Sequence, residues 1–112
     1  MGCDEEILGR VRRILSKRRG VAEKRMIGGL SFMINGKLCC GVNREGLLIR
    51  IGPEIREELL AERDVHPMNL GGRTVSSFVR VAPAAYETEA ALAMWVKMGV
   101  RYALAASQRK SN

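Results

Sequence analysis

The sequence predicts a two-layer α+β fold, an antiparallel sheet with helices on one face, in the order α-β-β-β-α-β-β-α. The spacing of apolar residues changes from helical to alternating and back to helical along the chain. Asn35-Gly36, the strongest short hairpin signal, separates two alternating runs. The length of 112 residues, 46% of them apolar, suits one core. We therefore expect a single domain over residues 1–112, with a core at about 4–106 and a tail at 107–112.

The first helix is expected to begin near Asp4, whose side chain can accept hydrogen bonds from free backbone N–H groups. Glu5 and Glu6 suit the positive end of that helix, and Gly20 suits the left-handed residue that ends it. Helical spacing relates the members of its apolar stripe, which are Ile7, Leu8, Val11, Ile14 and Leu15.

The segment that follows changes to a period of two, which predicts a three-stranded meander with strands near residues 30–34, 37–42 and 47–51. Successive residues of a strand point to opposite faces of a sheet, so one apolar set is expected beneath the helices. That set is Leu30, Phe32, Ile34, Leu38, Cys40, Val42, Leu47, Ile49 and Ile51.

A second helix and hairpin are expected next. Gly52-Pro53 ends the meander and begins a short helix through Leu60, since proline suits the first helical position. Short strands near 68–70 and 77–81 flank the turn residues Gly71-Gly72.

The last helix is predicted to begin after Thr88, whose hydroxyl is a good cap. Gly99 lies inside this helix, where glycine costs about 1 kcal/mol relative to alanine, and it therefore indicates close packing against a strand. The buried side is expected to carry Leu92, Trp95, Val96, Tyr102, Ala103 and Ala106.

Charge and composition narrow the class of protein. The net charge of +7 favours acidic partners, and 4% aromatic residues leave few rings for stacking nucleic-acid bases. No apolar run approaches the roughly 18 residues of a membrane-spanning helix, so no membrane association is expected. The acidic N-terminus is unlike a secretory signal, and an odd count of three cysteines disfavours a disulfide framework. We expect a cytoplasmic protein.

The sequence contains few residues of the types that usually serve in catalysis or metal binding. His66, the single histidine, precedes Pro67 in a predicted loop, and nothing nearby completes a triad or a metal site. Cys39 and Cys40 are neighbours on a predicted strand, where alternation points their thiols to opposite faces and prevents them from binding one metal. We expect no catalytic residues, no cofactor and no metal.

The sheet face opposite the helices is the leading candidate for a contact surface. Its apolar content predicts binding to a protein partner or to a second copy of the chain. Leu48→Glu is accordingly expected to perturb association more than folding. The predicted contact residues are Met33, Cys39, Leu48, Arg50, Phe78 and Arg80.

Direct nucleic-acid binding through the basic first helix is the alternative hypothesis. Phosphate contacts would give salt-dependent affinity without sequence specificity. A solubilising surface is the other interpretation of the same charges, because they surround the helix instead of forming one stripe. The residues concerned are Arg10, Arg12, Arg13, Lys17, Arg18 and Arg19.

The chain resembles the N-terminal domain of the TfoX/Sxy family over roughly residues 10–106. The resemblance rests mainly on residues 23–42, EKRMIGGLSFMINGKLCCGV, and departs from the family at Ile27, where an aromatic residue is common. Further matches, in the family order, are Arg50-Ile51-Gly52-Pro53, Pro67-Met68, Gly72-Arg73, Phe78-Val79 and Trp95-Val96.

The resemblance implies a two-layer fold similar to that of secretion chaperones and a non-enzymatic role. The best-known members regulate DNA transformation competence in bacteria together with a transcription regulator, the cyclic-AMP receptor protein. They carry a second, C-terminal domain that has no counterpart here, so a stand-alone N-terminal domain is expected. The family has no established catalytic residues to carry over.

Overall fold

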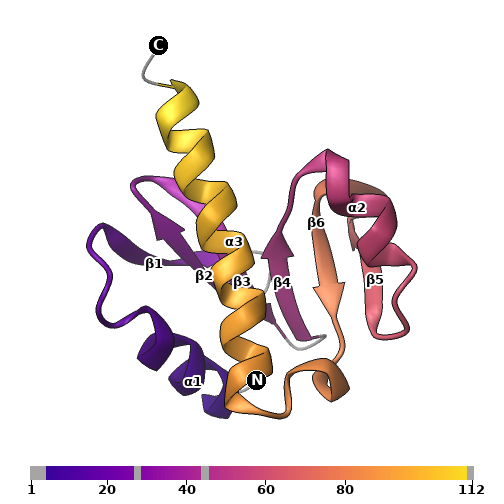
Figure 1. Ribbon diagram of the computed structural model, residues 1–112, viewed down its shortest axis with the longest axis horizontal. Helices are drawn as coiled ribbons and strands as arrows, with labels where there is room; N and C mark the ends of the chain where they lie inside the picture. The colour runs from indigo at the N-terminus through magenta and orange to yellow at the C-terminus, as the bar shows by residue number, and fades with distance from the viewer. Residues whose placement is uncertain (1–4, 27–28, 44–45, 111–112) are drawn as a thin grey trace.

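The computed structural model describes residues 5–26, 29–43 and 46–110, and it confirms the α+β class. Six antiparallel strands form one sheet in the order β1-β2-β3-β4-β6-β5. Helices α1, α2 and α3 pack against it (Figure 1). The elements are α1 (Glu5–Leu15), β1 (Val21–Met26), β2 (Gly29–Ile34), β3 (Lys37–Asn43), β4 (Gly46–Arg50), α2 (Pro53–Leu60), β5 (Val65–Leu70), β6 (Arg73–Val81), the 3-10 helix η1 (Pro83–Tyr86) and α3 (Glu89–Lys110).

The first meander has four strands, and the prediction of three was wrong. Residues Val21–Met26 pair with β2 as an edge strand, Val21 lying opposite Ile34. The sequence contains no signal for this strand, because its central residues, Glu23-Lys24-Arg25, are all charged and show no alternation of apolar and polar side chains. Charged side chains on an edge strand are a common protection against pairing with other chains.

Local signals placed the first hairpin turn and the cap of α3 correctly. The prediction that Gly20 ends the first helix was wrong, because α1 ends at Leu15 and Gly20, with φ 77°, lies in the turn before β1. The predicted cap at Asp4 lies outside the described residues. Asn35 and Gly36 both have positive φ, 51° and 81°, as a tight hairpin between β2 and β3 requires. The hydroxyl of Thr88 accepts a hydrogen bond of 3.0 Å from the backbone N–H of Ala91 and caps α3. That helix continues to Lys110, so most of the stretch predicted as a tail is helical.

The second hairpin is longer than predicted. β5 begins at Val65 and includes Pro67, which an edge strand tolerates because one side of its backbone needs no donor. The register between β5 and β6 then shifts: Pro67 lies opposite Val79, but Met68 lies opposite Val75. Residues 76–78 of β6 are therefore extra, and the strand bends there.

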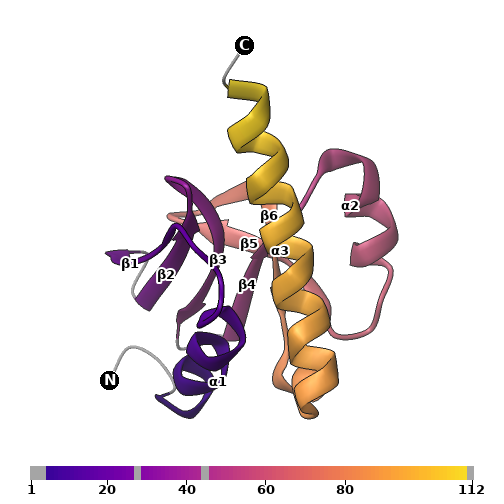
Figure 2. The same cartoon turned by 60° about the vertical axis from the view of Figure 1, so that its left-hand side comes forward.

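The main core fills the space between the sheet and the three helices. Apolar side chains of α1, α2 and α3 share one cluster with Phe32, Val42 and Ile49 of the strands. Figure 2 shows α1 and α3 together on one side of the sheet, with the C-terminal end of α3 projecting beyond the strands.

A smaller apolar cluster lies on the opposite face, which we call the open face. Leu48 of β4 and Phe78 of β6 are buried there with Met68, and Leu38 and Val75 pack against them. Leu38 belongs to β3, two strands away from β6. The end of the β5–β6 hairpin therefore bends over this face and covers part of it, without any helix.

Candidate interaction surfaces

Five of the six predicted contact residues lie on the open face of the structure, and they differ in how far they are buried. Leu48 and Phe78 lie on the open face, but only 4% and 7% of their surface is exposed, because the hairpin covers them. Met33, Arg50 and Arg80 are half-buried, and strand alternation directs them to the same face. The expectation of a broadly apolar exposed face was therefore wrong for Leu48 and Phe78.

Cys39 does not lie on the open face. Phe32 is opposite Cys40 and Met33 is opposite Leu38, so Cys39 is an extra residue, a β-bulge in β3. The bulge reverses the alternation, so Cys39 joins Cys40 in the main core and Leu38 turns to the open face. The predicted positions of Cys39 and Leu38 were both wrong for this reason.

The two thiols are buried side by side beneath α3. Cys39 Sγ lies 4.0 Å from the carbonyl oxygen of Val96. The hydrogen bond that the protonated Cys40 thiol makes with Cys39 and the loss of water around this buried group raise the pKa of Cys40 well above its ordinary value. A buried, protonated thiol is a poor nucleophile and a poor metal ligand, so Cys40 behaves as a small core residue.

Arg50 is the least satisfied polar side chain of the open face. Its Nη1 donates a hydrogen bond of 3.3 Å to the carbonyl oxygen of Leu38. Its Nε is buried and has no partner among the described residues. A guanidinium group has five N–H donors, and burying them without partners is unfavourable.

The strands carry almost no negative charge. Among the residues that the structure describes, Glu23 is the one acidic residue within a strand. It lies on the helix side of the sheet, where it pairs with Arg12 of α1. Alternation places Lys24, Arg50 and Arg80 on the open face, so this face is basic.

The basic first helix is partly neutralised within the molecule. Arg10, whose side chain is 14% exposed, lies 3.2 Å from the carboxylate of Glu89. It also donates to the carbonyl oxygens of Tyr86 and Glu87. Arg13 makes a longer ion pair of 3.4 Å with the same Glu89. These two arginines therefore attach α1 to the start of α3.

Arg12 is held by a second acid. Its Nε and Nη2 donate to the two oxygens of Glu23 at 2.8 and 3.0 Å, a bidentate pair. The hydrogen bond from Arg12 lowers the pKa of Glu23 below its ordinary value of 4.5. Of the six basic residues proposed for nucleic acid, Lys17, Arg18 and Arg19 are left as exposed side chains without an ion pair to any described residue.

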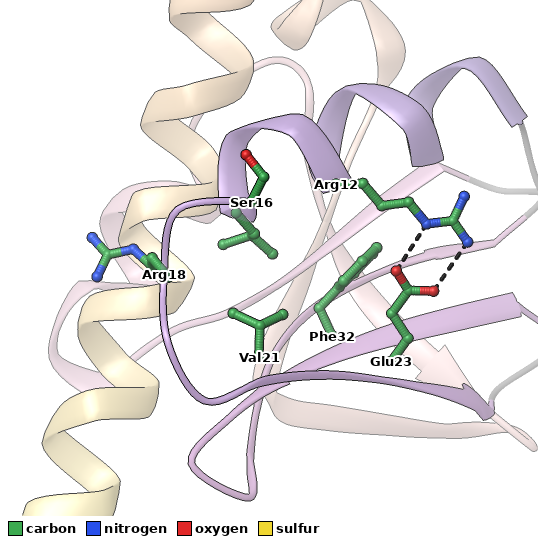
Figure 3. A pocket seen from close by; sticks show the side chains of 7 residues that line it. Arg12, Ser16, Arg18, Val21, Glu23 and Phe32 are labelled. Atoms are coloured by element: carbon green, nitrogen blue, oxygen red, sulfur yellow. Dashed lines mark hydrogen bonds and ion pairs between the residues drawn. The ribbon is translucent and has the colours of Figure 1, made fainter.

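A shallow pocket of about 330 Å³ lies between α1 and the first two strands (Figure 3). The Arg12–Glu23 pair closes one side, and the Arg18 side chain points away from it on the other. Phe32 in its floor is almost wholly buried. Sequence reasoning missed this pocket because it joins segments with no shared local pattern. The lining residues are Arg12, Leu15, Ser16, Arg18, Val21, Glu23 and Phe32.

The described residues offer few groups for chemistry. Across 5–26, 29–43 and 46–110, no three residues among His, Cys, Asp and Glu form a group that could hold a metal ion. His66 is half-buried in β5, and Arg73 is exposed at the start of β6. In the same ranges, every helix is too short or too polar to cross a bilayer.

Comparison with known proteins identifies one family. The family model described as the TfoX N-terminal domain matches residues 13–103, most of the chain, and confirms the resemblance seen in the sequence. Searches of curated proteins and of solved structures gave no match.

Proposed function

Because this chain belongs to the TfoX N-terminal domain family, which is linked to competence regulation, we propose that it is a regulatory adaptor acting through protein contacts. The family is generally regulatory and non-catalytic. The first candidate partner is a transcription regulator of the cyclic-AMP receptor type. The alternative partner is a second copy of the chain, which would form a homodimer through the same surface.

The observation that carries the proposal is the open face itself. All three helices pack on the other face, and the β5–β6 hairpin covers only the region around Leu48 and Phe78. Met33, Arg50 and Arg80 remain at the edge of that covered region, half-buried and within one face. They form the contact surface of the proposal, together with the exposed Lys24 on β1.

Direct nucleic-acid binding has less support. Arg10, Arg12 and Arg13 are engaged with Glu89 and Glu23. Nucleic acid would therefore depend on Lys17, Arg18 and Arg19, a short exposed cluster after α1. Three phosphate contacts would give weak binding with a shallow salt dependence, a slope of about −2.7 in log K against log[salt].

Calorimetric titration against purified cyclic-AMP receptor protein tests the proposed function. We expect the wild-type chain to bind and Met33→Glu to weaken binding at least about tenfold, a change of about 1.4 kcal/mol. Met94→Glu, which alters an exposed position on α3, is the control and should bind like the wild type.

Lys24→Glu on the same open face provides a second variant if Met33→Glu fails to fold. Absence of binding by the wild type would contradict a receptor-type partner. Equal weakening by Met94→Glu would contradict the open face as the contact surface. Sedimentation of the chain alone would reveal a homodimer.

A further inference from the structure

We propose that the open face binds an acidic segment of its protein partner, with Arg50 as the residue that receives a partner carboxylate. This inference rests on the proposed function and adds the chemistry of the partner. It depends on three observations: the unsatisfied guanidinium of Arg50, the sign of the charges on the face, and the apolar residues around Arg50.

The guanidinium of Arg50 lacks a counter-ion within the described residues. Arg10, Arg12 and Arg13 all have carboxylates within 3.4 Å, whereas Arg50 has one hydrogen bond, to the carbonyl of Leu38. Its Nε is buried without a partner. A half-buried cation is costly unless it is paired. A carboxylate reaching the other nitrogens from outside would supply the missing charge and a bidentate geometry.

The charges around Arg50 select the same kind of partner. Lys24 and Arg80 share its face, and the single acidic residue of the described strands points to α1 instead. The acidic side chains of α2 belong to the helix layer. A negatively charged segment would therefore meet attraction along this face and no repulsion from the strands.

Apolar neighbours favour a peptide over a nucleic acid. Arg50 lies opposite Phe78 across β4 and β6, and Leu38, which accepts its hydrogen bond, lies opposite Met33. Leu38 and Met33 are half-buried and able to contact an apolar side chain. A segment that combines acidic and apolar residues matches this surface, whereas a phosphate backbone would leave Leu38 and Met33 unused.

The test is an NMR titration of the isotope-labelled full chain with a short synthetic peptide of alternating glutamate and leucine. The matched probe replaces each glutamate by glutamine. We expect the acidic peptide to shift the Arg50 Nε–H resonance and the amides of Met33 and Leu38. We also expect binding to weaken about tenfold or more with the glutamine peptide and with Arg50→Met.

Two variants control for folding and for general charge. Arg50→Lys keeps the charge but loses the bidentate geometry, so its affinity should fall between wild type and Arg50→Met. Arg101→Met removes an exposed positive charge from α3 and should leave binding unchanged. Amide spectra of each variant show whether the fold is retained.

Three results would overturn the inference. Equal affinity for the glutamate and glutamine peptides would show that the carboxylate does not contribute to binding. Changes in chemical shift confined to residues 17–19 would show that the anion binds after α1. Tighter binding of a short DNA duplex at the same resonances would identify nucleic acid as the occupant. Self-association that shifts Arg50 and α2 together would assign the face to a second copy.

The receptor titration distinguishes this inference from the proposed function. If Met33→Glu abolishes receptor binding while Arg50→Met leaves it intact, the open face is the contact surface but Arg50 is not its anchor. If the acidic peptide binds as expected and the receptor does not, the partner chemistry stands and the choice of partner fails.

Discussion

At the scale of single residues, Gly99 determines how closely α3 approaches the sheet. A Cβ atom at this position would lie 2.3 Å from the carbonyl oxygen of Cys39, much closer than real Cβ contacts. The sequence predicted close packing from the glycine itself, and the structure confirms it. The partner in this contact is the bulged residue of β3, which explains why Cys39 is fully covered.

Gly99→Ala should therefore destabilise the protein. We expect the free energy of unfolding to fall by about 1–3 kcal/mol, since overpacking against backbone outweighs the gain of about 1 kcal/mol in helix propensity. Gly9→Ala is the matched control, because a Cβ there meets nothing within 4 Å and α1 should gain up to about 1 kcal/mol. Urea denaturation measures both, and a stabilised Gly99→Ala would contradict the close contact.

At the scale of elements, α1 is attached to the rest of the molecule by apolar packing and by the ion pairs of Arg10, Arg12 and Arg13. Ile7, Leu8 and Val11 are buried in the main core. Arg10 adds contacts to Glu89 and to two carbonyl oxygens, those of Tyr86 at the end of η1 and of Glu87 just after it. These contacts join segments 76 to 79 residues apart in the chain. The arginine is thus part of the fold, and its charge is not available as a free surface charge.

Arg10→Met tests this structural role. We expect it to lower the free energy of unfolding by about 1–2 kcal/mol, because charge-assisted hydrogen bonds are lost while the aliphatic packing is kept. Arg19→Met, an exposed residue outside the helix, should change stability by less than about 0.5 kcal/mol. Equal effects of the two variants in urea denaturation would show that the Arg10 contacts contribute nothing.

At the scale of the whole molecule, the sheet has an apolar cluster on each face. The larger one is covered by helices, and the smaller one is covered by the bent end of the β5–β6 hairpin. Leu48 is buried in this second cluster, so it is a core residue and not the exposed contact residue that the sequence predicted. The prediction that Leu48→Glu acts mainly on association is replaced by a prediction about folding.

Leu48→Glu should destabilise the whole fold. We expect a loss of more than about 3 kcal/mol, because the apolar packing of Leu48 would be lost and a carboxylate would be desolvated among Met68 and Phe78, a cost that exceeds its attraction to Arg80 on the neighbouring strand. Met94→Glu, at a position 52% exposed, should stay within about 0.5 kcal/mol of the wild type. Amide spectra and urea denaturation measure both effects. A folded Leu48→Glu with unchanged stability would show that the hairpin does not cover this face.

The sequence by itself determined the presence and order of α1, α2 and α3, the hairpin at Asn35-Gly36, the cap at Thr88 and the family. Each of these depends on residues close together in the chain, whose periodicity, backbone preference or side-chain reach is a local property. The open face was also predicted from alternation, and Met33, Arg50 and Arg80 lie where that alternation put them.

Only the tertiary structure decided the position of Cys39, the cover over Leu48 and Phe78, and the pairing of the arginines of α1. A bulge changes the face of a residue without changing its neighbours in sequence, because it depends on the register with another strand. Likewise, the bend of β6 depends on its pairing with β5, and the ion pairs depend on where α3 begins. Contacts between distant segments set all three, and no local pattern encodes them.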